Sequence, residues 1–201
     1  MTSIINKASF FLLITISSCT VDLGYIQLLR ESLEKNTITN LDTFYESGFS
    51  FIRATKGNNQ AVFILSDIDN GFEKWVGSDE EEIITFKGLI IESNKLDYDI
   101  SHHNKIAIKE NFLINDFSSY ISLSNPIAEY LPADYMLKKD LNKKDILFCN
   151  DIVHIYKRII PVIKESSYIK ICTKEGKVVS SMQRLNPKDK EITIEFFYQY
   201  E

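Results

Sequence analysis

Alternating apolar and polar residues, the pattern of half-buried β-strands, run through most of the chain after residue 48. The clearest case is residues 192–200, where the even positions are Ile, Ile, Phe, Tyr and Tyr and the odd positions are Thr, Glu, Phe and Gln. Successive side chains of a strand point to opposite faces, so this segment is predicted to bury one face. Further strands are predicted at residues 49–54, 60–67, 72–76, 82–86, 89–92, 120–123, 145–163, 168–172 and 177–183.

Three two-residue turns join neighbouring strands in this series. They are Asn70-Gly71, Lys87-Gly88 and Glu175-Gly176. Asn-Gly is the strongest short hairpin signal, because a tight turn between twisted strands needs residues that accept positive φ. The uninterrupted apolar run at residues 61–65 predicts a strand that is buried on both faces. The pattern therefore favours an antiparallel meander sheet.

One N-terminal helix is predicted at residues 21–35. Tyr25, Ile26, Leu29 and Leu33 recur there at helical spacing. No repeat, low-complexity tract or linker divides the chain, so one mainly β domain is expected.

The pattern is weaker in the middle of the chain. Residues 94–104 are polar and predicted to form a loop, whereas residues 106–114 are apolar enough to predict a strand. Asn125-Pro126 and Leu131-Pro132 are expected to interrupt regular structure, because the residue before a proline is restricted and proline lacks a backbone donor. The strand order in this region stays open.

The first 18 residues have the pattern of a signal peptide. Lys7 and the start amine supply positive charge, residues 8–16 are mostly apolar, and the small residues Ser17 and Ser18 precede Cys19. The apolar run is shorter than the ~20 residues that span a bilayer. The pattern resembles the lipobox of bacterial lipoproteins, and the alternative is an ordinary secretory signal with a chance cysteine.

The lipobox resemblance implies a processed and anchored protein. Residues 1–18 would be removed and Cys19 would become the acylated first residue of a single β-rich domain, residues 19–201. Two acyl chains or more are needed for stable anchoring. Thr20, where an aspartate would favour the inner membrane, implies the periplasmic side of the outer membrane.

The overall charge excludes one class of partner. The formal net charge is −5 at pH 7, whereas nucleic-acid binding needs a basic face that neutralises phosphates. No nucleic acid is therefore expected as a partner, and the membrane is expected to be reached only through the lipid.

Cys149 and Cys172 remain once Cys19 is assigned to the lipid, and each lies in an apolar run. In an oxidising compartment a disulfide between neighbouring strands is one interpretation. Two buried thiols that act as small apolar side chains are the other.

No residues predict catalysis, a metal or a cofactor. The carboxylates at residues 79–82 do not predict a paired acid/base site, because strand neighbours point to opposite faces. They are expected in a solvated turn, with a weak calcium site as the alternative. His102-His103 lies in a polar segment and His154 is far away in sequence, so these histidines do not predict a zinc site. No phosphate-binding glycine loop and no serine nucleophile motif occurs.

Three aromatic residues are candidates for stacking on sugar rings. They are Trp75, Tyr198 and Tyr200, with packing in the core as the alternative.

Four segments carry a resemblance to a known family. They are residues 48–65, 70–79, 83–91 and 173–187, which include the Trp75 turn and the run Ser181-x-Gln183-x-Leu185. Together they resemble the YjbF/GfcB family of group 4 capsule and exopolysaccharide lipoproteins. The resemblance implies a sheet that closes to a barrel-like domain and acts in the production or export of a surface polysaccharide.

The expected function is therefore a non-enzymatic one in the cell envelope. The protein would bind polysaccharide or the proteins that export it. Two alternatives stay open: a periplasmic polysaccharide-modifying hydrolase, which would need two carboxylates across a groove, and a structural envelope lipoprotein without a capsule role.

Overall fold

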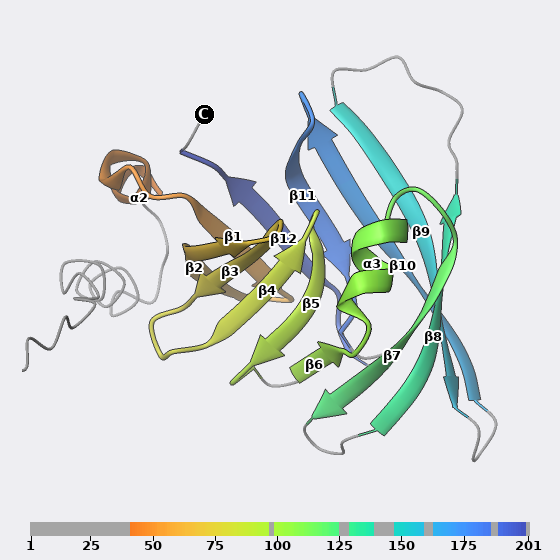
Figure 1. Ribbon diagram of the computed structural model, residues 1–201. Coiled ribbons are helices and arrows are strands. Elements are labelled where there is room, and N and C mark those ends of the chain that lie inside the picture. The colour runs from red at the N-terminus through yellow and green to blue at the C-terminus, as the bar shows by residue number, and fades with distance from the viewer. Residues whose placement is uncertain are drawn as a thin grey trace, which may run out of the picture.

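The computed structural model describes residues 41–96, 99–124, 129–138, 147–158, 163–185 and 189–199. Cys19, Tyr200 and the helix predicted at residues 21–35 lie outside these ranges. Within them the chain forms twelve strands and two short helices, α2 and α3 (Figure 1). In chain order the elements are α2 Asp42–Ser47, β1 Phe51–Lys56, β2 Asn59–Asp69, β3 Phe72–Val76, β4 Glu82–Phe86, β5 Leu89–Asn94, β6 Asp99–His102, α3 Lys105–Asn111, β7 Phe117–Ser124, β8 Glu129–Lys138, β9 Leu147–Arg158, β10 Ile163–Lys174, β11 Lys177–Gln183 and β12 Ile192–Phe197.

The strands form one closed barrel in which each pairs with its neighbours in sequence, and β12 pairs with β1. All pairs are antiparallel, and closure aligns Phe51 with Phe197 and Lys56 with Ile192. The predicted antiparallel meander that closes to a barrel is confirmed. No described helix is long or apolar enough to span a bilayer.

The three predicted turns are hairpins in the structure, between β2 and β3, β4 and β5, and β10 and β11. Both residues of each turn have positive φ: 53° and 84° at Asn70-Gly71, 47° and 84° at Lys87-Gly88, and 54° and 81° at Glu175-Gly176. This is the geometry of a type I′ turn, whose twist matches that of the strands.

The central part of β2 is buried on both faces, as its apolar run predicted. Phe63 belongs to the barrel interior, whereas Val62 and Ile64 belong to a second cluster. That cluster includes Phe44 of α2 and Phe51 of β1. Helix α2 therefore covers the outer face of β1 and β2.

The prediction of a strand at residues 106–114 is wrong, because residues 105–111 form helix α3. The Asn104 side chain caps the helix by accepting a 3.0 Å hydrogen bond from the Ala107 N–H. Ile108 and Phe112, four residues apart, are fully buried in the main core. Ile106, one of the apolar residues of the predicted strand, is 71% exposed.

Two further predictions for the middle of the chain are wrong. Residues 94–104 were predicted as loop but include strand β6. The prediction failed because His102, counted as a polar residue, is buried together with Ile100. Leu131-Pro132 lies within β8. Pro132 pairs with Tyr120 of β7, and the described β8–β9 pairs begin only at Ala133, so the missing N–H of the proline is tolerated.

The two ends of the barrel differ. Helix α3 connects β6 to β7 at the end that carries the β2–β3, β4–β5 and β10–β11 hairpins, and it contributes to the interior core. The opposite end, here called the β1–β2 end, carries the β1–β2 hairpin and the β3–β4 turn at residues 77–81. Ile108 and Phe112 thus pack into the core at the α3 end.

Candidate functional site

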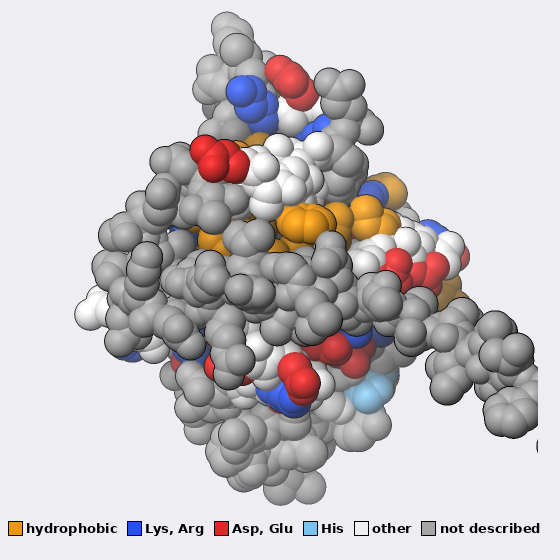
Figure 2. Space-filling model, turned by 90° about the vertical axis from the view of Figure 1, so that its left-hand side faces the viewer, with side chains coloured by type: hydrophobic (Ala, Val, Ile, Leu, Met, Phe, Trp, Pro, Cys, Tyr) orange, Lys and Arg blue, Asp and Glu red, His pale blue; other side chains and the backbone are white. Residues whose placement is uncertain are grey.

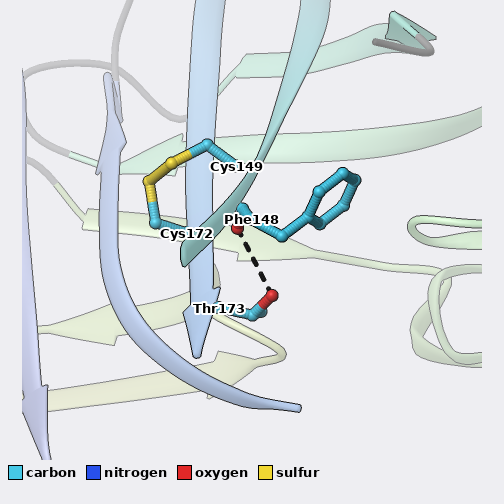
Figure 3. The surroundings of a disulfide bond; sticks show 4 residues. All are labelled: Phe148, Cys149, Cys172 and Thr173. Atoms are coloured by element: carbon cyan, nitrogen blue, oxygen red, sulfur yellow. Dashed lines mark hydrogen bonds between the residues drawn. A yellow bond between two sulfur atoms is a disulfide. The ribbon is translucent and has the colours of Figure 1, made fainter. Parts of the chain in front are cut away.

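The two cysteines lie opposite each other on β9 and β10. The register pairs Cys149 with Cys172, and their sulfur atoms form a disulfide with a Cα–Cα distance of 4.0 Å (Figure 3). Ile171, the neighbour of Cys172, belongs to the interior core. Because strand neighbours point to opposite faces, the disulfide lies on the outer face of the barrel. Next to it, the Thr173 hydroxyl donates to the Phe148 carbonyl at 3.3 Å.

Trp75 and Tyr198 take part in a hydrogen-bonded network inside the barrel. The Trp75 Nε1–H donates to the Thr85 hydroxyl at 2.9 Å, and that hydroxyl donates to Glu73 Oε2 at 2.9 Å. The Tyr198 hydroxyl donates to Glu73 Oε1 at 2.8 Å. Both carboxylate oxygens of Glu73 therefore have a donor within the protein.

Burial dominates the electrostatics of Glu73. Desolvation raises the pKa of this carboxyl above its ordinary value, and the hydrogen bonds from Tyr198 and Thr85 oppose that rise. Thr85 accepts a hydrogen bond from Trp75 and donates one to Glu73, so the network positions the Trp75 ring within the interior.

The candidate sugar-stacking residues do not form an exposed platform. Trp75 is 0% exposed, so neither face of its ring reaches solvent in this structure. Tyr198 is half-buried beside Phe196, at 6.0 Å between ring centroids. Tyr200 lies outside the described residues.

A second polar group lies in the interior on the β6–β9 side. The rings of Phe117, Tyr135 and His154 form a stack, with centroid distances of 4.6 Å and 4.3 Å. The Tyr135 hydroxyl lies 3.3 Å from Nε2 of His102. Both histidines are 2% exposed.

These two histidines are neutral at physiological pH. Burial lowers the pKa of His102 to about 3, with smaller effects from His103 and Lys105. Burial also lowers the pKa of His154, and His102 adds to the effect. Neutral imidazoles can bind metals, but no group of three metal-binding side chains occurs among the described residues.

The carboxylates of residues 79–81 lie in the predicted turn, between β3 and β4, whereas Glu82 begins β4. Glu80 pairs with Lys95 at 2.6 Å and Glu82 with Lys74 at 2.7 Å. Glu81 Oε2 accepts a hydrogen bond from the Asp79 N–H at 2.9 Å. These charges are satisfied locally and do not converge on a shared site.

A cavity of about 140 Å³ lies at the β1–β2 end of the barrel. Its lining residues come from β1, β2, β4 and β12 and from the segments after β5 and β11: Ala54, Lys56, Asn59, Gln60, Ala61, Phe63, Ile83, Leu96, Leu185 and Ile192. Sequence reasoning missed this cavity. The sequence predicted strands at residues 49–54 and 60–67, but the pairing of Ala54 with Ala61 depends on a register that the turn at residues 57–58 did not reveal.

On the face shown in Figure 2, acidic and basic side chains are interspersed around a strip of apolar side chains. The ion pair between Arg53 and Glu195 and the pair between Lys105 and Glu92 agree with this mixed pattern.

Comparison with known proteins identifies the fold. No protein-family model matches the chain, and no curated protein matches it. Among solved structures, the chain is similar to the crystal structure of the hypothetical lipoprotein YmcC from Escherichia coli (K12). The TM-score is 0.66 at 14% sequence identity, over 88% of this chain and 96% of that chain. The chain therefore has the barrel fold of a protein that is described as a lipoprotein.

Proposed function

We propose that this protein is a lipid-anchored, non-enzymatic binding protein of the cell envelope that assists the production or export of a surface polysaccharide. The observation that carries the proposal is the agreement between the lipobox-like run ending at Cys19 and a fold shared, over nearly its whole length, with a protein described as a lipoprotein. The polysaccharide role rests on the resemblance of residues 48–65, 70–79, 83–91 and 173–187 to the YjbF/GfcB lipoproteins.

The disulfide supports an extracytoplasmic location. Disulfides persist in oxidising compartments such as the bacterial periplasm and are rare in the cytosol. The Cys149–Cys172 bond joins β9 and β10, whose register aligns twelve residue pairs. It therefore reinforces a region that the sheet already orders.

The interior network argues against Glu73 as the acid of a hydrolase. A glycoside hydrolase uses two carboxyl groups roughly 5–9.5 Å apart on either side of the scissile bond. Glu73 is held by Tyr198 and Thr85 and faces the buried Trp75 side of the barrel. It is not placed to protonate a leaving group in an open groove.

The anchor is tested by mass spectrometry of the protein extracted from membranes of its host. We expect a mature chain that begins at Cys19 and carries acyl chains on that residue. Cys19→Ala should abolish acylation, whereas the matched variant Cys149→Ser/Cys172→Ser should retain it. An unprocessed amino terminus with a free Cys19 thiol would refute the anchor.

The polysaccharide role needs a separate experiment, because an anchored protein can have another task. Deletion of the gene should reduce cell-associated surface polysaccharide, measured by sugar analysis after acid hydrolysis. Expression of the wild-type chain should restore it, and Cys19→Ala should not. Unchanged polysaccharide in the deletion strain would leave the anchor intact but reject this role.

A further inference from the structure

The cavity at the β1–β2 end has apolar inner walls. Ala54 and Ala61 face each other across the β1–β2 pair, and both pack against the main core. Phe63, Ile83 and Ile192 are buried and provide the deeper walls. The two alanines leave room that a larger apolar side chain at either position would occupy.

Polar side chains lie at the rim of the same cavity. Asn59 and Gln60 are exposed, and their amides can both donate and accept hydrogen bonds. Lys56 forms a 2.7 Å ion pair with Asp189, so its charge is balanced. A ligand here would meet hydrocarbon below and neutral hydrogen-bonding groups above.

The volume limits what can enter. An apolar cavity of about 150 Å³ accepts benzene or xenon, whereas sites for drug-sized ligands measure about 300–1,000 Å³. At about 140 Å³, this cavity is suited to a short hydrocarbon segment and too small for a whole sugar ring with its hydroxyl groups and their hydration. Burial of hydroxyls against these walls would also leave them without partners.

We propose that this cavity binds the end of an aliphatic chain belonging to a small amphiphile, with the polar head held at the Asn59–Gln60 rim. This inference goes beyond the proposed function and does not depend on the Cys19 anchor or on a polysaccharide role. It assigns the β1–β2 end of the barrel, opposite the end that carries α3, as the ligand-binding end.

Trp75 provides a built-in reporter for the test. It is the single tryptophan of the chain, it is fully buried, and it pairs across strands with Ile83, which lines the cavity. A bromine atom quenches indole fluorescence only at short range. The full chain in lipid nanodiscs is titrated with 6-bromo-1-hexanol, and we expect saturable quenching of Trp75 that 1-hexanol reverses.

A series of competitors tests whether the aliphatic chain of the ligand is the part that binds in the cavity. Each added methylene contributes about 0.8 kcal/mol on burial, so the competition constant should tighten about fourfold at each step from 1-butanol to 1-pentanol to 1-hexanol. Free glucose, which has a polar ring and no tail, should not compete. Competition by glucose as strong as that by 1-hexanol would overturn the proposal.

The matched variants distinguish quenching by ligand in the cavity from quenching by ligand dissolved in the surrounding lipid. Ala61→Leu should fill the cavity and abolish saturable quenching, whereas Thr193→Leu, on the exposed face of the adjacent β12, should retain it. Near-UV circular dichroism verifies folding, and Ala54→Leu replaces Ala61→Leu if the latter does not fold. Absence of saturable quenching in the wild type, or quenching that persists in the folded Leu variant, would refute the site.

Discussion

At the scale of single residues, the tip of the β4–β5 hairpin is held by a buried side chain of β11. The Gln183 side chain accepts a hydrogen bond from the Ile90 N–H at 3.0 Å and donates to the Gly88 carbonyl at 2.9 Å. One amide side chain of β11 therefore binds the carbonyl of the turn residue Gly88 and the N–H of Ile90 in β5 across the barrel. This contact explains why a polar residue at position 183 is only 2% exposed.

Gly88→Ala should destabilise the protein more than Gly176→Ala. Both glycines lie in type I′ turns at φ of 84° and 81°, so each substitution costs about 1 kcal/mol of backbone strain. A methyl group at residue 88 would also lie 3.0 Å from Val178 Cγ1, whereas nothing lies within 4 Å at residue 176. The added crowding should cost about 1–3 kcal/mol more in urea unfolding. Equal losses would contradict the packing at Gly88.

At the scale of elements, the sequence pattern predicted what depends on local alternation and turn chemistry. The hairpins at Asn70-Gly71, Lys87-Gly88 and Glu175-Gly176 were predictable because positive φ is a local requirement. Helix α3 was not predictable, because Ile108 is the only buried residue among its seven, and the exposed apolar residue Ile106 favoured a strand. The cavity depended on the register of β1 with β2 and was not predictable either.

Helix α3 should stabilise the barrel through its interior contact. Phe112 is fully buried against the core and meets the Phe117 ring at 6.2 Å between centroids, so Phe112→Ala should lower the free energy of unfolding by about 3–5 kcal/mol. Ile106→Ala, at a 71% exposed position of the same helix, should change it by less than about 0.5 kcal/mol. Thermal and urea unfolding of the two variants provide the comparison, and similar losses would place α3 outside the core.

The disulfide between β9 and β10 should also contribute to stability. It closes a loop with a sequence separation of 23 residues, for which the chain-entropy model gives about 3 kcal/mol. Cys149→Ser/Cys172→Ser should lose about this amount in urea unfolding without reductant. Reductant should lower the stability of the wild type to the same level and leave the double variant unchanged. A wild type insensitive to reductant after full unfolding would show that the bond does not form.

At the scale of the whole molecule, two neutral histidines in the barrel interior link folding to pH. The pKa of His102 is about 3 in the folded protein, below the ordinary value of 6.5, and that of His154 is lowered in the same direction. The unfolded chain therefore binds more protons than the folded chain between pH 6.5 and 3. The stability from these groups is complete above pH 6.5 and is lost as the pH falls.

Below pH 6.5, each histidine should add up to about 1.4 kcal/mol per pH unit to the decrease in unfolding free energy as the pH falls. His154→Phe, which retains a ring against Tyr135, should therefore reduce the slope of unfolding free energy between pH 6.5 and 4.5. The measurement is urea unfolding at several pH values, and an unaltered slope in His154→Phe would show that His154 does not titrate as described.

The closure of β1 onto β12 has a consequence for how this protein can recruit other molecules. At this seam all six residues of β1 pair with β12, so the two strands present no row of unpaired backbone N–H and C=O groups there to an incoming chain. Strand addition at the seam, the mode by which many adaptor domains capture extended peptides, is thereby closed off. Recognition along this part of the wall must instead pass through side chains.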